Sequence, residues 1–217
     1  MQIFWKGQAC FSLVVSQAKQ EQVKIVIDPY DESIGFKLPS MEADIVLISH
    51  EHPDHNNAKG VSGSPFVASF PGEYEVKNIF IKGIPSFHDN SQGKERGQNT
   101  IFTIAAEDMR LCHLGDLGQK ELTSEQVDKI GEVDVLFIPV GGVYTIDAKE
   151  ASAIVSQIEP KIVIPMHYAL PRLKFKLGEV EQFLKVMGVK ESDPEQKLLL
   201  RAKDLIGDEM KIVVLKP

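Results

Sequence analysis

The feature that most constrains the fold is an apolar run that leads into a cluster of histidines. Residues 44–48 read Asp-Ile-Val-Leu-Ile, and after one serine residues 50–55 read His-Glu-His-Pro-Asp-His. A nearly continuous apolar run is typical of a strand buried on both faces of a sheet. Three imidazoles and a carboxylate within six residues seldom occur by chance and indicate a metal site. We therefore expect a buried strand that delivers metal ligands at its end.

Two further apolar runs repeat this plan. Residues 110–115 (Arg-Leu-Cys-His-Leu-Gly) lead into Asp116, and residues 161–166 (Lys-Ile-Val-Ile-Pro-Met) lead into His167. In α/β sheets, sites form just outside the C-terminal ends of strands. We therefore expect Asp116 and His167 to lie beside the histidine cluster.

The rest of the chain mixes short strands with a few helices. Strands are expected at residues 2–5, 10–15, 23–27, 45–48, 66–69, 78–81, 100–105, 110–114, 133–140, 161–166, 198–201 and 211–215. Helices are expected at residues 123–130, 148–158 and 178–187, the second with a capping-box pattern of Asp147 and Glu150. With no evident domain boundary, the pattern predicts one α/β or α+β domain over residues 1–217.

Composition narrows the class of protein. The formal net charge is −7, which disfavours a general nucleic-acid binder because such proteins neutralise phosphates with Lys and Arg. Cys10 and Cys112 lie too far apart in sequence for a metal-binding motif and are expected to be buried thiols. The N-terminal residues do not form a secretory-signal pattern, and no apolar run has the length of a membrane span. We expect a cytoplasmic protein without a membrane partner.

The residues at the strand ends resemble the metallo-β-lactamase superfamily. Residues 50–55 match its H-x-H-x-D-H signature, Gly115-Asp116 matches the later Gly-Asp motif, and His167 matches the last ligand histidine. The start of the chain, residues 5–11 and 27–29, is similar to the opening hairpin of the subgroup with ascorbate-6-phosphate lactonase-like hydrolases, although Gln8 stands where that subgroup often has His. The resemblance implies a four-layer αββα sandwich with a metal site at one edge of the sheets.

The resemblance also implies the roles of individual side chains. It assigns a first metal ion to His50, His52 and His88, a second to Asp54, His55 and His167, and a bridging role to Asp116. Asp54 and Asp116 are the catalytic candidates, because Asp54 could orient the nucleophile as well as bind metal. His113 is an alternative to His88, and we interpret it as a supporting or structural histidine.

The expected chemistry is hydrolysis. Ligands of imidazole and carboxylate without thiolate suit zinc and also accept manganese or iron. Two such ions make hydroxide available at neutral pH for attack on a carbonyl or phosphoryl group. The centre keeps a net positive charge, which favours a small anionic ester, lactone or phosphoester. We expect contacts to this substrate from Arg96, Asn99, Tyr144, Thr145 and Tyr168.

Two other functions remain open alternatives. The superfamily also contains nucleases and phosphodiesterases that act on nucleic acid, but this acidic chain lacks an inserted domain or a basic arm. A non-catalytic metal-binding module is the other alternative, and the complete set of ligands argues against it. The sequence does not define the substrate, the native metal or the oligomeric state.

Overall fold

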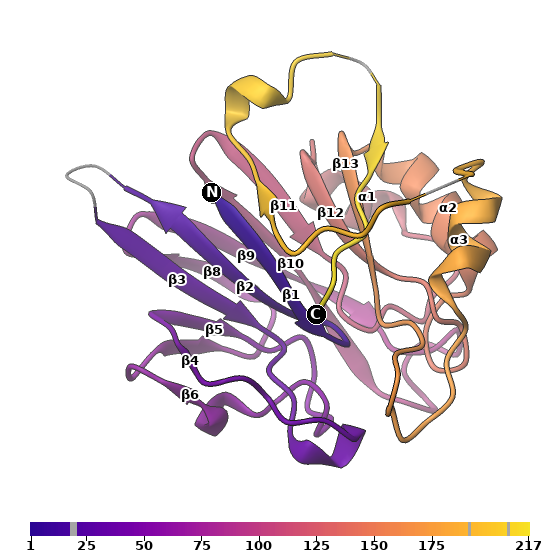
Figure 1. Ribbon diagram of the computed structural model, residues 1–217, viewed down its shortest axis with the longest axis horizontal. Helices are drawn as coiled ribbons and strands as arrows, with labels where there is room; N and C mark the ends of the chain where they lie inside the picture. Colours follow the sequence, from indigo (N-terminus) through magenta and orange to yellow (C-terminus); the bar gives the residue numbers. More distant parts are fainter. Residues whose placement is uncertain (18–20, 191, 208) are drawn as a thin grey trace.

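Two mixed β-sheets pack face to face in the computed structural model, which describes residues 1–17, 21–190, 192–207 and 209–217. The first sheet has the order β14 (Leu198–Leu199), β1 (Gln2–Gly7), β2 (Cys10–Ser16), β3 (Gln22–Ile27), β5 (Ile45–Leu47) and β7 (Phe66–Ala68). The second has the order β15 (Lys211–Ile212), β13 (Ile162–Met166), β12 (Val135–Pro139), β11 (Met109–His113), β10 (Gln98–Ala106), β9 (Ile79–Phe87) and β8 (Gly72–Val76). Figure 1 shows the first sheet crossing in front of the second.

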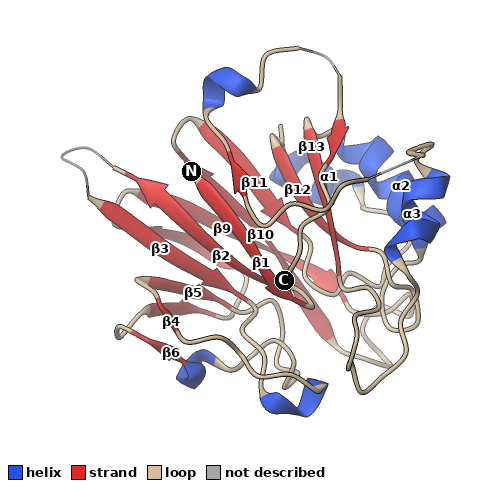
Figure 2. Cartoon of the chain, viewed as in Figure 1, coloured by secondary structure: helices blue, strands red, loops and turns tan. Residues whose placement is uncertain are grey.

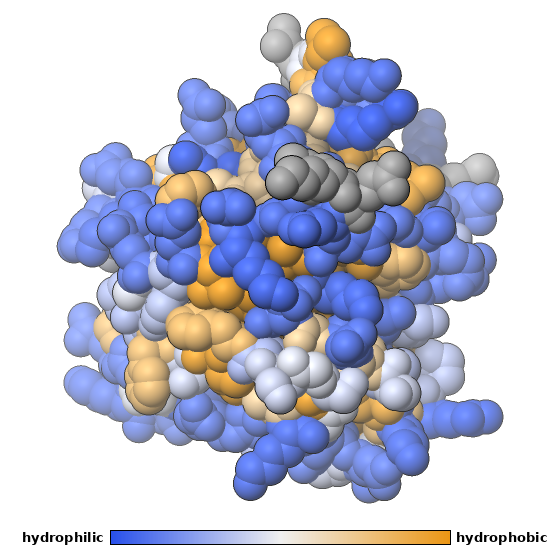
Figure 3. All heavy atoms as spheres, turned by 90° about the vertical axis from the view of Figure 1, so that its left-hand side faces the viewer, coloured by the Kyte–Doolittle hydropathy of each residue, from blue (hydrophilic) through white to orange (hydrophobic). Residues whose placement is uncertain are grey.

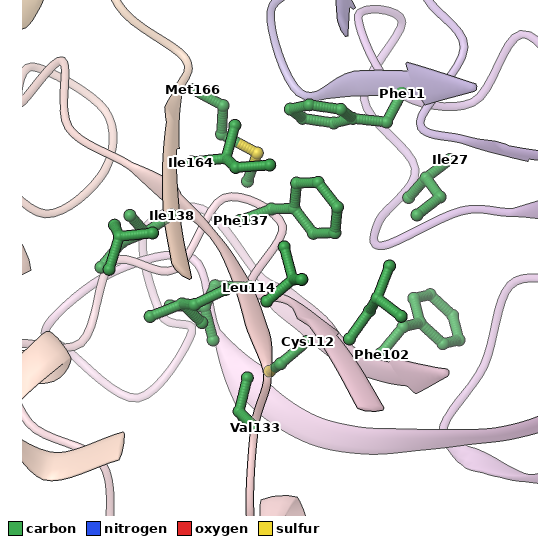
Figure 4. Packing of buried hydrophobic residues seen from close by; sticks show 14 of the residues in the cluster. Phe11, Ile27, Phe102, Cys112, Leu114, Val133, Phe137, Ile138, Ile164 and Met166 are labelled. Atoms are coloured by element: carbon green, nitrogen blue, oxygen red, sulfur yellow. The ribbon is translucent and has the colours of Figure 1, made fainter. Parts of the chain in front are cut away.

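The main hydrophobic core lies between the two sheets. The rings of Phe11 on β2 and Phe137 on β12 are 4.4 Å apart, centroid to centroid, so the facing strands are in direct contact. Figure 4 shows these rings among buried aliphatic side chains that come from both sheets. Both cysteines are buried thiols without a disulfide, as predicted.

The outer faces of the sheets are covered in different ways. Helices α1 (Ser124–Ile130), α2 (Ala148–Ile158) and α3 (Val180–Val186) gather beside β12 and β13 (Figures 1 and 2). On the first sheet, Val26 and Val46 face outward into a second, smaller core with Tyr30 and Ile34. The segment that supplies this cover contains the 3-10 helix Glu32–Ile34 in place of an α-helix. The predicted α/β sandwich of two sheets is therefore confirmed, with a low content of helix.

Most predicted elements lie where the patterns placed them. Helix α2 spans the predicted residues 148–158, and the carboxylate of Asp147 accepts from the backbone N–H groups of Lys149 and Glu150. Three short strands were missed: β4 (Met41–Glu42) and β6 (Val61–Ser62), which pair with each other, and β8 at the edge of the second sheet. In β8 polar side chains alternate with half-buried ones, so the strand has no apolar run to reveal it.

The surface is mainly hydrophilic on the face shown in Figure 3, with apolar patches between charged side chains. Within the described residues, none of the helices has the length and apolar character needed to cross a membrane.

Candidate metal centre

The candidate ligands lie at the C-terminal ends of four strands. Residues 50–55 follow β5, His88 follows β9, Asp116 follows β11 and His167 follows β13. Strand β10 is antiparallel to both β9 and β11, while β11, β12 and β13 are mutually parallel, so β9, β11 and β13 run in one direction. Their ends therefore meet at one edge of the second sheet, where the loop after β5 of the first sheet joins them.

The side chains at this edge form two ligand sets. One consists of His50, His52 and His88, and the other of Asp54, His55, Asp116 and His167. In each set, one donor atom per residue lies within 4.8 Å of the others. The structure thus brings together all seven residues predicted from the sequence.

Asp116 connects the two sets. Its Oδ2 atom lies 3.3 Å from the Nε2 atoms of His88, His55 and His167. When two ligand atoms each lie 2.0–2.1 Å from a tetrahedral zinc ion, they are about 3.3 Å from each other. The spacing around Asp116 therefore fits a carboxylate that is shared between two metal ions.

Unsatisfied polar atoms in the cluster also fit metal ions. His50 Nε2, His55 Nε2 and Asp116 Oδ1 are buried without a hydrogen-bond partner among the described residues. A buried polar atom without a partner costs about 1–3 kcal/mol. Coordination of a cation would satisfy these atoms, so the residues present fit a metal centre.

Burial and charge set the protonation of the cluster. Burial lowers the pKa values of His50, His52 and His167, which keeps these imidazoles in the neutral form that binds metals. Burial would raise the pKa of Asp116, but the neighbouring histidines His167 and His55 hold it well below its usual value. The centre therefore presents three neutral imidazoles, those of His50, His52 and His167, beside the ionised Asp116. At His55 the carboxylates of Asp116, Asp54 and Asp28 outweigh burial and raise the pKa of the imidazole well above its usual value.

His113 does not belong to either set. Its Nε2 atom lies 2.9 Å from the carbonyl oxygen of Ala9, and its Nδ1 accepts from the backbone N–H of Gly115 at 3.1 Å. Both ring nitrogens are thus used inside the protein. Of the two histidines considered for the first set, the structure places His88 there.

Asp28 and Ser49 orient His50 and His55 from the side opposite to the candidate metal positions. The Asp28 carboxylate accepts from His55 Nδ1 at 3.0 Å and from the backbone N–H and hydroxyl of Ser49 at 2.7 and 2.6 Å. Because the Ser49 hydroxyl donates to Asp28, it accepts from His50 Nδ1 at 3.0 Å. Both imidazoles therefore turn Nε2 toward the candidate metal positions. Sequence reasoning missed this role, although Asp28 also follows an apolar strand.

The opening hairpin supports the last ligand. The carbonyl oxygen of Gln8 accepts from the backbone N–H of His167 at 3.1 Å and from Trp5 Nε1 at 2.8 Å. Tyr168 packs on the Trp5 ring with centroids 4.8 Å apart. The first sheet thereby fixes the position of a side chain carried by the second.

A cavity of about 250 Å³ opens at the cluster. Five of the candidate ligands line it, together with Ser33, Ile34, Pro53, Arg96, Tyr144 and Phe175. The Arg96 guanidinium lies 4.4 Å from the centre of the Tyr144 ring, and this ring meets Phe175 edge to face at 5.9 Å. Arg96 and Tyr144 thus line the cavity, whereas Ile34, in the 3-10 helix, and Phe175, in a loop, carry no sequence signal.

The three other predicted substrate contacts do not line this cavity. Asn99 Nδ2 donates to Ser86 Oγ and to the Leu114 carbonyl, and its Oδ1 accepts from the backbone N–H of Asp116. Tyr168 is buried against Trp5, and Thr145 is not among the described residues that line the cavity. Asn99 nevertheless borders a second cavity beside His52, whereas Thr145 and Tyr168 line neither cavity. The substrate contacts of these three residues stay predictions.

The loop that carries Arg96 is fixed by Asp89. The Asp89 carboxylate accepts from four backbone N–H groups, those of Ser91, Gly93, Glu95 and Arg96, at 2.7–3.0 Å. These bonds lower the pKa of Asp89 to about 2 against the effect of burial. A single ionised side chain beside His88 thus holds Arg96 at the mouth of the cavity.

Comparison with known proteins agrees with this geometry. Residues 2–167 match the family described as the beta-lactamase superfamily domain. A UPF0173 metal-dependent hydrolase of Pyrococcus abyssi is 29% identical, with 89% of each chain covered. Another UPF0173 protein of that organism is 31% identical over 77% of this chain and 83% of its own length. A solved Thermotoga maritima structure, described as a candidate Zn-dependent hydrolase of the metallo-beta-lactamase superfamily, has a TM-score of 0.79 and 39% identity, covering 99% of this chain and 97% of its own.

Proposed function

Because the chain belongs to the metallo-β-lactamase superfamily and is a metal-dependent hydrolase, as its Pyrococcus abyssi relative is by name, we propose that it uses two metal ions and cleaves a small anionic ester, lactone or phosphoester. The observation that carries the proposal is the position of Asp116, whose Oδ2 lies 3.3 Å from a histidine of the first set and from two of the second. One carboxylate shared in this way supports a pair of ions over a single one.

Zinc is the metal that we propose, with manganese or iron as alternatives. When bound, the ions would lower the pKa of a water molecule and stabilise the negative charge that develops on the attacked group. The protein itself supplies the orientation of the reactants. Asp54 faces the cavity with a pKa held below its usual value, because the neighbouring His55 outweighs the effect of burial. As a carboxylate, Asp54 can accept a hydrogen bond from the attacking water.

Arg96 supports an anionic substrate. Its guanidinium lies over Tyr144 at the cavity, and no ion pair with a carboxylate is found for it within the described residues. An arginine of this kind can bind a carboxylate or phosphate group in bidentate fashion. The net charge of −7 and a cavity of about 250 Å³ favour a small molecule over a nucleic acid. We place the enzyme in the cytoplasm, whose reducing conditions suit its two unpaired cysteines.

A pair of substitutions tests the proposal. We expect the wild-type protein to bind two zinc equivalents by elemental analysis, and the double variant His52→Ala, Asp54→Ala to bind fewer. Loss of several kcal/mol of transition-state stabilisation predicts a fall in activity of about a thousandfold. The activity panel contains aryl phosphodiesters, lactones and single-stranded RNA.

Glu75→Ala is the control, because Glu75 is an exposed carboxylate on β8 that belongs to neither ligand set and lines no cavity at the centre. Its metal content and activity should equal those of the wild type. Wild-type protein without bound metal, or a double variant with full activity, would contradict the proposed function.

A further inference from the structure

A second cavity adjoins the candidate metal centre on the side of the first ligand set. Its volume is about 370 Å³, and His50, His52, Phe70, Pro71, Arg96 and Gly97 lie in its wall. His52 and Arg96 line the first cavity as well. These two side chains therefore form the border between the two cavities.

Phe70 is the large apolar side chain of the second cavity. It lies between β7 and β8, and 69% of its surface is exposed. Its backbone is nevertheless held firmly. The Tyr74 hydroxyl donates to the Phe70 carbonyl oxygen at 2.7 Å, and the segment lies so close to β9 that a Cβ atom at Gly83 would come within 2.9 Å of that oxygen. The fold thus presents an exposed ring at a fixed place beside the metal centre.

The size and lining of the cavity define what it can hold. An apolar cavity of about 150 Å³ is large enough for benzene, so about 370 Å³ accommodates a phenyl ring or a short alkyl chain. Aromatic pairs in offset or edge-to-face contact contribute about 0.5–1.5 kcal/mol beyond the area they bury. Arg96, at the border of the two cavities, provides the positive charge beside this apolar surface.

We propose that the second cavity binds an apolar group, the size of a phenyl ring or a short alkyl chain, that is attached to the anionic substrate, with Phe70 as the residue that determines specificity for it. The inference rests on the proposed function, because the anionic group has to lie at the metal centre and Arg96. The substrate is then amphiphilic: its charged group lies at the centre, and its apolar group extends past His52 toward Phe70.

Binding of two phosphonates to the zinc-loaded full chain tests this inference. Their carbon–phosphorus bond is not an ester, so titration calorimetry measures affinity without turnover. We expect benzylphosphonate to bind about tenfold more tightly than methylphosphonate, which corresponds to the added apolar contact. Phe70→Ala should remove this advantage and leave the affinity for methylphosphonate within about twofold.

Phe80→Ala is the matched control, because Phe80 is a 56% exposed phenylalanine on β9 that lines neither cavity at the centre. It should change neither affinity. A benzyl advantage that survives Phe70→Ala but disappears in Phe175→Ala would place the apolar group in the first cavity and overturn the inference, as would equal affinities for the two phosphonates. If the zinc-loaded protein binds neither phosphonate, the proposed anion site itself fails.

Discussion

Asp28 is the residue on which the orientation of the histidine cluster depends most. It accepts from His55 directly and from Ser49, which in turn accepts from His50. A carboxylate behind a metal-binding histidine fixes the ring and makes it a better ligand. Asp28 is not among the residues that line the cavity, so its effect on metal binding is exerted through the two imidazoles.

We predict that Asp28→Asn weakens binding of the metal ion in the second set about 10–100-fold. The backbone φ of 47° at this position is one that Asn tolerates well, so the fold should persist. Equilibrium dialysis against zinc, followed by elemental analysis, measures the two affinities separately.

Asp134→Asn serves as the control, because Asp134 accepts a backbone N–H from Arg110 at 2.8 Å at the opposite end of β12. It should leave both zinc affinities unchanged. An Asp28→Asn protein with the wild-type affinity for both ions would contradict the positioning role.

At the scale of elements, the loop after β11 joins the two sheets at the centre. Gly115 has a φ of 57°, and a Cβ atom there would overlap the Asn99 amide oxygen and the Ser49 side chain. The Asn99 amide oxygen in turn accepts a hydrogen bond from the backbone N–H of Asp116. The absence of a side chain at Gly115 therefore lets the loop carry Asp116 close to the loop after β5.

We predict that Gly115→Ala destabilises the protein by about 1–3 kcal/mol through overpacking and reduces zinc binding at both sets, because it displaces Asp116. Urea unfolding gives the free energy, and elemental analysis gives the metal content. Gly188→Ala is the control, since Gly188 has a φ of 75° but open space around it. If both variants lose the same stability and neither loses zinc, strain alone explains Gly115 and the steric argument is wrong.

The elements themselves were predictable where the local pattern is strong. Apolar runs identified β5, β12 and β13, which are buried on both faces, and the capping residues identified the start of α2. The edge strand β8 was not predictable, because its Glu73 and Glu75 are exposed and it has no apolar run. It forms a strand through its antiparallel pairing with β9, which the local sequence does not reveal.

At the scale of the whole molecule, Asp44 ties the two sheets together at the end opposite to the metal centre. Its carboxylate accepts from the backbone N–H of Lys24 on β3 at 2.8 Å and pairs with Lys77, in the turn between β8 and β9, at 2.5 Å. The Lys24 N–H and the Lys77 ammonium outweigh burial and lower the pKa of Asp44 below the ordinary 3.8. The folded state thus binds a proton at Asp44 less readily than the unfolded chain.

We predict that Asp44→Asn lowers the free energy of unfolding at pH 7 by about 1 kcal/mol. Since the folded-state pKa is depressed, the contribution of Asp44 is complete above pH 3.8 and is lost as the pH falls through the folded-state value. The difference between variant and wild type should therefore shrink below pH 3.8 in urea unfolding with chelator present. Glu125→Gln, which removes an exposed pair with Lys129, should leave stability unchanged. A difference that stays constant with pH would exclude the ionic contribution.

The sequence by itself determined most of the residues that could bind metal, because His50 to His55 lie within one short segment and Asp116 and His167 each follow an apolar strand. Such local patterns are visible without knowledge of the fold, whereas His88 was assigned only by the resemblance. Only the tertiary structure decided between His88 and His113, directed Asn99 and Tyr168 into the interior, and brought Phe175 and Phe70 to the centre. These choices depend on the register and packing of segments far apart in the chain. The register of a strand and the packing of a loop decide whether a given side chain faces solvent, the core or a ligand.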